Sequence, residues 1–231
     1  MKVRAVLFGA TGMVGEGVLH IALGHPEVES VLVIGRRPSG LVHPKLREIV
    51  HNDFYDFSSI ANQLSGYNAC FFCLGVSSVG MKEGDYTHVT YDLTLAAART
   101  LASRNSDMTF CYVSGAGTDG TEQGRIMWAR VKGRTENALR ALPFKAVYLF
   151  RPGFIKPIAG LHNAYSLAKI LGWGYPLWKA VFPNYVCTLE EVGFAMVSVA
   201  LHGYGQPILE NRDLSLFGPS DPTHTPEGNR A

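Results

Sequence analysis

The sequence predicts an α/β protein whose doubly wound, mostly parallel β-sheet is covered by helices on both faces. Short apolar segments alternate along the chain with segments of helical periodicity, which is the pattern of parallel strands joined by helices. The first apolar segment, residues 3–8, is a continuous run of the kind found in strands that are buried on both faces. A glycine-rich turn, residues 9–15, follows this segment and opens the first helix.

Composition excludes several classes of protein. The chain has 231 residues, of which 47% are hydrophobic and 17% charged, as is typical of a globular domain. A formal net charge of +2 argues against a general binder of nucleic acid or of membrane surfaces. The apolar run near the start of the sequence stops at Gly9, which is too short for a signal peptide. The most apolar later stretch, residues 154–182, is interrupted by lysines and prolines, so it does not resemble a spanning helix. We therefore expect a soluble, cytoplasmic protein.

The alternating segments define the expected elements in order. Apolar runs predict six strands: Val3–Phe8, Val31–Ile34, Leu46–Val50, Ala69–Cys73, Met108–Val113 and Ala146–Phe150. Helical spacing predicts four helices between them: Gly12–Leu23, Ser58–Leu64, Asp85–Ser103 and Arg125–Leu142. A last helix is expected to begin after Thr188, because Thr188 can cap it while Glu190 and Glu191 occupy its positive end.

The turn after the first strand is the strongest functional signal. Small residues at this point let the chain turn sharply, let the backbone approach a pyrophosphate, and let the helix pack closely on its strand. The N–H groups at the start of the helix then attract the anion. The turn predicts a dinucleotide-binding Rossmann-type fold, and an ordinary glycine-rich turn is the structural alternative. The expected cofactor-binding residues of the turn are Gly9, Thr11, Gly12, Met13, Val14 and Gly15.

The end of the second strand indicates which dinucleotide binds. An acidic residue about 20 positions after the glycines would accept the ribose hydroxyl of NAD. Here the strand ends in Gly35-Arg36-Arg37 without a carboxylate, and guanidinium groups suit a 2′-phosphate. The sequence therefore predicts NADP(H) in preference to NAD(H). The alternative is a solvated arginine pair at a strand end.

The spacing G-x-x-G-x-x-G resembles that of the extended and atypical short-chain dehydrogenase/reductase superfamily. Asn52-Asp53-Phe54 resembles the loop whose Asp meets the adenine amino group, and Cys73-Leu74-Gly75 resembles the turn that lines the cofactor. The resemblance covers residues 3–217. It implies that Asp53, Phe54, Cys73, Leu74 and Gly75 contact the cofactor.

Two later segments resemble the atypical branch of this superfamily. They are Val131-Lys132-Gly133-Arg134-Thr135-Glu136 and Phe150-Arg151-Pro152-Gly153. Both look like segments of Tat-interacting-protein-like oxidoreductases and of bacterial NAD(P)-binding epimerase-like proteins. The resemblance implies that Pro152 lies beside the nicotinamide, that residues 85–103 and 125–142 form a homodimer interface, and that the function is reductive in some members and regulatory in others.

The resemblance also implies a catalytic serine and a Tyr-x-x-x-Lys pair. A lysine four residues after the tyrosine lies on the same helix face and lowers the pKa of the phenol. The chain offers Ser114 and Lys132, and the resemblance implies that the lysine also holds the nicotinamide ribose. Trp128, however, occupies the position where the tyrosine is expected. An indole has no proton that ionises in the useful range, so Trp128 cannot serve as the general acid or base.

Two functions remain open because of this tryptophan. The first is an NADP(H)-binding oxidoreductase or isomerase that acts on a small carbonyl or hydroxyl compound, with Tyr91, Tyr112 or Tyr165 as a substitute for the missing tyrosine. The second is a catalytically silent NADP(H)-binding sensor or scaffold. Under either function, Trp128 is either a core aromatic or a wall against the nicotinamide or substrate. Ser114, Lys132 and Trp128 are the candidate catalytic residues.

We expect one domain over residues 1–217. Residues 1–155 are the expected dinucleotide platform, residues 156–217 a small substrate lid with a closing helix, and residues 218–231 a disordered tail. Cys70 and Cys73 have the spacing of half a metal site, but residues three apart on a strand face opposite sides. We expect no metal, and neither a hydrolase nucleophile elbow nor a P-loop is present.

Overall fold

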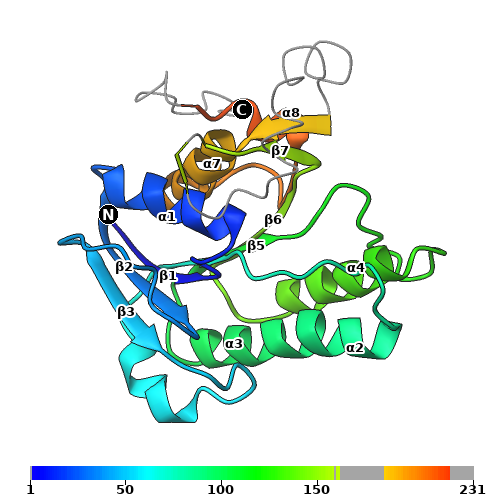
Figure 1. Cartoon of the computed structure of the whole chain (residues 1–231), viewed down its shortest axis with the longest axis horizontal. Coiled ribbons are helices and arrows are strands. Elements are labelled where there is room, and N and C mark those ends of the chain that lie inside the picture. The colour runs from blue at the N-terminus through cyan, green and yellow to red at the C-terminus, as the bar shows by residue number, and fades with distance from the viewer. Residues whose placement is uncertain (1, 159, 162–184, 219–231) are drawn as a thin grey trace.

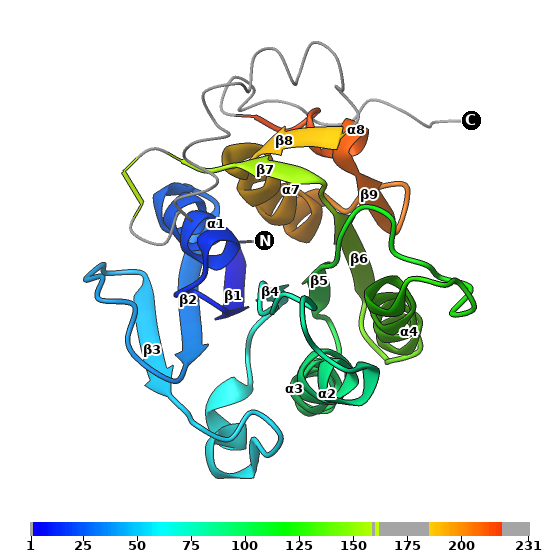
Figure 2. The same cartoon turned by 45° about the vertical axis from the view of Figure 1, so that its right-hand side comes forward.

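A seven-stranded parallel sheet forms the centre of the molecule (Figures 1 and 2). The computed structural model describes residues 2–158, 160–161 and 185–218. In spatial order the strands are β3 (Leu46–Val50), β2 (Val28–Gly35), β1 (Val3–Phe8), β4 (Ala69–Phe72), β5 (Thr109–Val113), β6 (Ala146–Arg151) and β9 (Ile208–Glu210). All neighbouring strands of this sheet are parallel, so the predicted doubly wound α/β class is confirmed.

Helices cover both faces of the sheet. Figure 1 shows α1 (Met13–Gly24) and α7 (Leu189–His202) on one face, and α3 (Leu93–Ala102) and α4 (Met127–Arg140) on the other. The expected helix over residues 85–103 is interrupted, because a short α2 and a π-helical turn precede α3. The remaining elements are α2 (Glu83–Thr87), the π-helical turn η2 (His88–Asp92), the 3₁₀ helix η1 (Ser58–Leu64), β7 (Phe154–Lys156), β8 (Val186–Thr188) and α8 (Asn211–Leu214).

The hydrophobic core consists of two layers, one on each face of the sheet. Along β1, Ala5 and Leu7 belong to the layer under α1 and α7, whereas Val6 and Phe8 belong to the layer under α3 and α4. All four side chains are fully buried. The alternation of side chains along a strand therefore explains why β1 is apolar at every position from Ala5 to Phe8.

Two glycines allow α7 to pack closely on α1. A Cβ at Gly17 of α1 would lie 2.3 Å from the Leu189 side chain, and a Cβ at Gly193 of α7 would lie 2.8 Å from Ile21. Such distances are shorter than real Cβ contacts, so a side chain at Gly17 would displace the Leu189 side chain and one at Gly193 would displace Ile21. The segment that follows, β9, joins the main sheet beside β6. Residues 189–210 therefore complete the α/β core.

The start of α7 is the one the sequence predicts. Thr188 Oγ1 accepts a hydrogen bond from the Glu191 N–H at 3.1 Å, and the Glu191 carboxylate accepts one from the Thr188 N–H at 2.7 Å. This capping box satisfies backbone donors that a helix start leaves unpaired. The expected division of the chain at residue 155 stays a prediction. Residues 159, 162–184 and 219–231 of the expected lid and tail, with Tyr165 among them, lie outside the described residues.

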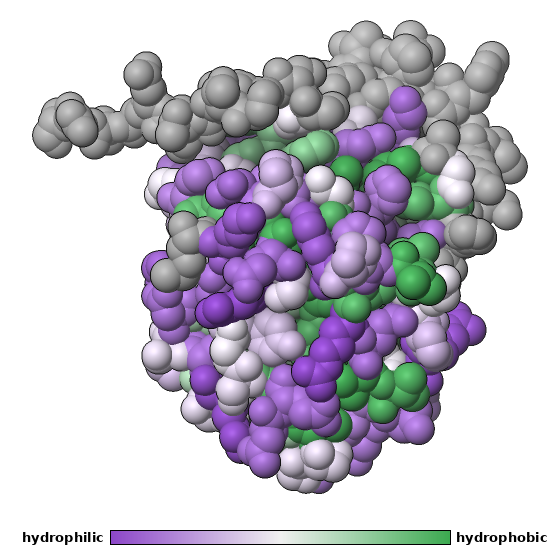
Figure 3. Space-filling model, turned by 90° about the vertical axis from the view of Figure 1, so that its left-hand side faces the viewer, coloured by the Kyte–Doolittle hydropathy of each residue, from purple (hydrophilic) through white to green (hydrophobic). Residues whose placement is uncertain are grey.

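The surface on the side where β2 and β3 lie is mostly hydrophilic, and hydrophobic side chains there form small separate patches (Figure 3). Among the residues that the structure describes, no helix has the length and apolar character needed to cross a bilayer.

Candidate functional site

The glycine turn between β1 and α1 leaves no room for side chains. Gly9 has a φ of +86°, and a Cβ on it would lie 2.8 Å from the carbonyl carbon and oxygen of Cys73. A Cβ on Gly15 would lie 2.0 Å from the Gly9 oxygen. The first glycine therefore permits the turn beside β4, and the third permits the helix to approach the strand, as the motif requires.

The start of α1 presents backbone donors to this turn. Gly12 is the N-cap of the helix, and it supplies no side-chain acceptor to the amides of the first turn. Its own N–H donates to the Gly9 oxygen at 2.9 Å, which closes the turn. A helix start without a side-chain cap is a site where an anion can accept hydrogen bonds from the backbone.

Two adjoining cavities extend from the turn along the carboxyl edge of the sheet. The first, of about 370 Å³, is lined by Gly9, Ala10, Thr11, Val33, Ile34, Gly35, Arg36, Arg37, Phe54 and Leu74. The second, of about 280 Å³, is lined by Arg36, Asn52, Phe54, Tyr55, Leu74, Gly75, Val76, Val89 and Leu93. The cavities share Arg36, Phe54 and Leu74. They open at the carboxyl ends of β1 and β4, where the strand order of the sheet reverses. Doubly wound sheets bind ligands at this place.

The charge of these cavities is positive. Arg36 lines both cavities and Arg37 lines the first. Among the described residues, no Asp or Glu lines either cavity. Both arginines are exposed. A phosphate group could therefore reach them without displacing a carboxylate partner.

The other predicted cofactor residues are placed unequally. Leu74 and Gly75 line the cavities as expected, and Cys73 carries the carbonyl that faces Gly9. Asp53 is exposed and does not line either cavity, because its carboxylate accepts the N–H of Tyr55 at 2.9 Å within the loop. Its neighbour Asn52 lines the second cavity instead. Met13, Val14 and Gly15 lie in α1 and line neither cavity.

Ser114 lies at the carboxyl end of β5 and is held by a second hydroxyl. Its Oγ lies 2.9 Å from Thr118 Oγ1, and both residues are buried. Thr118 donates its own proton to the Gly115 oxygen at 2.8 Å, so Ser114 is the donor within the pair. A substrate oxygen that approached Ser114 would compete with Thr118 for this proton.

Lys132 reaches the same strand end from α4. Its Nζ donates to the Val113 oxygen at 3.3 Å and lies 5.2 Å from the centre of the Tyr112 ring. Burial lowers the pKa of Lys132 to about 8, against the opposing effect of the Glu136 carboxylate. The structure therefore brings Lys132 to the end of β5, next to the residue that precedes Ser114.

Trp128 lies one helical turn before Lys132 and covers the loop after Ser114. Cβ atoms placed on Gly115 and Gly117 would each lie 3.7 Å from its ring. Trp128 is half-buried, so its ring packs on this loop while part of it faces outward.

Neither described candidate for the missing phenol is suited to proton exchange at this site. Tyr112 is 1% exposed within the core layer under α3 and α4, and burial raises its pKa far above the usual value. Tyr91 packs its ring beneath the Arg134 guanidinium, 4.4 Å from ring centre to Cζ. The third candidate, Tyr165, lies outside the described residues.

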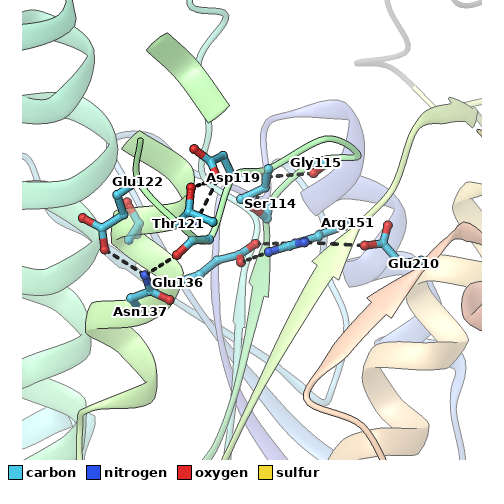
Figure 4. A network of polar contacts seen from close by, with 12 residues as sticks. Ser114, Gly115, Asp119, Thr121, Glu122, Glu136, Asn137, Arg151 and Glu210 are labelled. Carbon is cyan, nitrogen blue, oxygen red and sulfur yellow. Dashed lines mark hydrogen bonds and ion pairs between the residues drawn. The ribbon is translucent and has the colours of Figure 1, made fainter. Parts of the chain in front are cut away.

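A buried ion pair supports the catalytic candidates from behind. Glu136, 2% exposed, accepts hydrogen bonds from Arg151 Nε at 3.0 Å and from Arg151 Nη2 at 2.5 Å (Figure 4). Arg151 also lies 3.6 Å from the Glu210 carboxylate of β9. Because Lys132 and Glu136 are four residues apart on α4, the pair joins the helix face that carries Lys132 to the end of β6.

The loop after β5 contacts both segments that carry this ion pair, the end of β6 and α4. The Ala116 N–H donates to the Pro152 oxygen at 2.9 Å, so the residue after Arg151 holds the loop that carries Ser114. On the helix side, a Cβ at Gly133 would lie 1.7 Å from the Asp119 oxygen. Asp119 closes the far end of the loop by accepting from Thr121 and Gly124, the former drawn in Figure 4.

Sequence reasoning missed three residues of this arrangement, Thr118, Glu136 and Arg151. Thr118 has a signal only in retrospect, as a hydroxyl four positions after the candidate serine. Glu136 had a clearer signal, because a residue four positions after Lys132 on a helix must share its face. Its partner Arg151 could not be inferred, since the contact joins a helix to a strand 15 residues away.

A parallel sheet of this strand order, with a glycine turn at the point where the order reverses, defines a Rossmann-like α/β protein. No family model matches the chain. Among solved structures, an ADP-L-glycero-D-manno-heptose-6-epimerase of Helicobacter pylori matches with a TM-score of 0.64 and 14% identity, over 92% of this chain and 80% of that one. The Bordetella bronchiseptica enzyme WbmF, solved with NAD⁺ and UDP, matches with a TM-score of 0.61 and 15% identity, over 93% and 76%. The chain thus shares the fold of these enzymes.

Curated relatives are closer in sequence. A protein of Aspergillus oryzae named fmp52-1, mitochondrial, is 30% identical over 158 residues, which are 66% of this chain and 66% of that protein. A protein of Meyerozyma guilliermondii named FMP52, mitochondrial, is 24% identical over 203 residues, 86% and 85% of the two chains. The first match therefore spans just under two thirds of its relative's length.

These relatives correct the expected location. Their names place them in mitochondria, which contradicts the cytoplasmic location expected from the sequence. The expectation rested on the lack of a long apolar segment. A secretory signal needs such a segment, but mitochondrial transit peptides are amphipathic and rich in arginine, so hydropathy alone does not detect them.

Proposed function

We propose that this chain binds NADP(H) and acts as an oxidoreductase or isomerase on a small carbonyl or hydroxyl compound. The observation that carries this proposal is the pair of cavities beside the glycine turn, which present Arg36 and Arg37 and no carboxylate. Structures with the same fold support a nicotinamide cofactor, since WbmF was solved with NAD⁺ and with NADH. The finer resemblance to Tat-interacting-protein-like oxidoreductases and the homodimer stay predictions.

The residues around the turn fit a dinucleotide. A pyrophosphate would accept hydrogen bonds from the uncapped start of α1, where the lack of side chains on Gly9 and Gly12 leaves the backbone accessible. The 2′-phosphate would lie against Arg36 and Arg37, and the adenine against Asn52 and Tyr55 in the second cavity. A bound nicotinamide would supply hydride chemistry.

Two side chains of this protein would act on the substrate oxygen. Ser114 would donate its hydroxyl proton to that oxygen in place of Thr118, and so orient it. Lys132, beside the end of β5, would stabilise negative charge on the same oxygen when it is protonated. The Glu136–Arg151 ion pair would hold α4 and the Pro152 turn in place around them.

Titration of NADPH and NADH into the protein, followed by fluorescence, tests the cofactor. We expect NADPH to bind at least 10-fold more tightly, because charge-assisted hydrogen bonds to a phosphate contribute about 1.5–3 kcal/mol. The double variant Arg36→Ala/Arg37→Ala should lose this preference while it keeps NADH binding. Arg4→Ala removes an exposed arginine of β1 that lines neither cavity and serves as the matched control. Tighter binding of NADH by the unaltered protein would contradict the NADP(H) assignment.

Trp128 favours a second function, a catalytically silent NADP(H)-binding sensor or scaffold. Its ring covers the loop after Ser114 and carries no ionisable proton. Single-turnover reactions of bound NADPH with aldehydes and ketones separate the two functions. Oxidation of NADPH supports the enzyme. Binding without oxidation, in both the unaltered protein and Trp128→Phe, supports the sensor, and activity gained in Trp128→Tyr would show that the rest of the site is competent.

A further inference from the structure

The reaction proposed above needs a group that takes or gives a proton at the substrate oxygen, and Trp128 cannot supply it. The buried phenols near β5 do not replace it. Tyr112 and Tyr86 are 1% and 2% exposed, and burial raises the pKa of both. A phenol that resists ionisation and does not reach solvent or substrate is a poor general base.

Lys132 reaches the end of β5, where the candidate serine follows in the chain. Its Nζ lies 3.3 Å from the oxygen of Val113, the residue before Ser114. One N–H is used by this hydrogen bond, so the neutral amine keeps its lone pair for another partner. Trp128 covers the loop from Gly115 to Gly117 one turn away. Among the described residues, this amine is therefore an ionisable group that lies near the candidate serine.

We propose that Lys132 itself accepts the proton of a substrate hydroxyl at this site and returns it to a carbonyl oxygen in the reverse direction. This role rests on the proposed oxidoreductase function. The substrate class is then a compound with a secondary or primary alcohol, or the corresponding ketone or aldehyde. Ser114 donates a hydrogen bond to the reacting oxygen, and Lys132 exchanges the proton with it.

The proton transfer balances without a further co-reactant beyond the nicotinamide dinucleotide. In the oxidative direction, the substrate O–H bond breaks and an N–H bond forms on the neutral amine, while the alcohol C–H bond breaks and its hydride would pass to the oxidised nicotinamide. In the reductive direction, the ammonium loses a proton to the oxygen of the reduced product. Lys132 thus ends each half-reaction with the opposite protonation state and must exchange its proton with water before the next turnover.

Charged and titratable groups surround Lys132 on several elements. Glu136 lies on its own helix, one turn further along, and Tyr112 faces it from β5. Arg151 of β6 pairs with Glu136 through two hydrogen bonds, which removes much of the charge that Glu136 would otherwise exert on the lysine. Glu210 of β9 lies beyond Arg151. Burial dominates this environment and lowers the pKa of Lys132 to about 8, which suits an acid and base near neutral pH.

A labelling experiment tests the ionisation of Lys132 without a known substrate. Acetic anhydride reacts with neutral amines, and mass spectrometry of the labelled peptides gives the reactivity of each lysine from pH 6 to pH 11. We expect the reactivity of Lys132 to rise around pH 8. Exposed Lys145 in the same sample is the internal reference for the reagent. A rise only above pH 10 would overturn the proposal, since the amine would then stay charged at working pH.

Single-turnover kinetics with the aldehyde and ketone panel test the role itself. Lys132→Arg keeps a positive charge but cannot exchange a proton near neutral pH, so we expect NADPH to bind within about threefold of the unaltered protein and the rate to fall at least 100-fold. Lys145→Arg, the matched control, should keep its rate within twofold. Adding Trp128→Tyr to Lys132→Arg supplies a phenol one turn away and should restore the rate at least 10-fold.

Other results would overturn the assignment in distinguishable ways. A normal rate in Lys132→Arg would show that Lys132 only supplies charge. Loss of the rate in Tyr185→Phe or Tyr165→Phe, with Lys132→Arg active, would assign the proton to a phenol of the later segment. Tyr185 is included because its backbone adjoins Gly153 and its side chain is 64% exposed. NADPH binding without turnover of any carbonyl compound would overturn the oxidoreductase function, and the catalytic role with it, even if the amine ionises near pH 8.

Discussion

The two loops that meet at the carboxyl edge of the sheet are built by opposite means. The turn after β1 has no side chains at Gly9 and Gly15, because the backbones of the turn, β4 and α1 approach too closely for a Cβ. The loop after β5 instead depends on side chains, from the Ser114–Thr118 pair to the buried Glu136–Arg151 ion pair behind it. One loop presents backbone donors to a ligand, and the other presents functional groups.

Under the proposed function, this difference would separate cofactor binding from reaction. Backbone amides at a helix start carry no titratable group, so the cofactor side should bind over a wide range of pH. The loop after β5 contains an amine whose pKa is lowered to about 8, so the reaction side should depend on pH. Substitutions should therefore act on packing and binding at the first loop, and on charge at the second.

The largest expected effect is at the buried ion pair. Glu136→Leu leaves the Arg151 guanidinium with only the more distant Glu210 carboxylate, and we expect the free energy of unfolding to fall by about 3–4 kcal/mol. The double variant Glu136→Leu/Arg151→Met removes both charges and should recover most of that loss. Denaturant unfolding of both variants measures these changes. Equal losses in the single and the double variant would show that shape, and not charge, holds this loop.

The matching test of the glycine turn is Gly15→Ala. The added methyl group would meet the Gly9 oxygen and carbon, so α1 must shift from β1, and we expect a loss of about 2–3 kcal/mol together with weaker NADPH binding. Gly24→Ala is the control, because nothing lies within 4 Å of a Cβ there and alanine favours the helix. Thermal unfolding and NADPH titration measure both effects. Unchanged stability of Gly15→Ala would remove the contrast between the two loops.

The smallest expected effect is a gain in stability from Lys132→Met. The unfolded chain keeps the lysine proton up to its ordinary pKa of 10.5, whereas the folded protein releases it at about 8, so burial of this charge costs stability below pH 8. We expect the variant to gain about 1–2 kcal/mol at pH 7, after the loss of the hydrogen bond to Val113. The gain should disappear as the pH rises from 8 to 10.5. Urea unfolding at a series of pH values measures it, and a gain that does not vary with pH would point to packing alone.

Much of the fold follows from local patterns. The strand ranges Val3–Phe8 and Leu46–Val50 agree with the structure residue for residue, and the cap at Thr188 is the one observed. The expected helix over residues 85–103 was incomplete in one respect, because a π-helical turn at His88–Asp92 divides it. Such a turn arises from packing around an inserted residue, which apolar periodicity does not reveal.

The candidate site was predictable where a single motif defines it. Arg36, Arg37, Leu74 and Gly75 line the cavities, as their places at strand ends indicate. Asp53 follows the same pattern in sequence but turns its carboxylate to the Tyr55 amide. Which oxygen or amide a side chain finds depends on the loop conformation, and a short loop offers several choices of similar energy.

The sequence by itself determined the class of fold, the position of the glycine turn, and the lack of a phenol at Trp128. These features are local, since periodicity, glycine spacing and residue chemistry act over a few neighbouring residues. Only the tertiary structure decided which groups surround Lys132, because Tyr112 and Val113 of β5 reach the lysine, and Arg151 of β6 reaches its neighbour Glu136. The pKa of a lysine depends on burial and on charges brought together in space, and no local pattern encodes either of them.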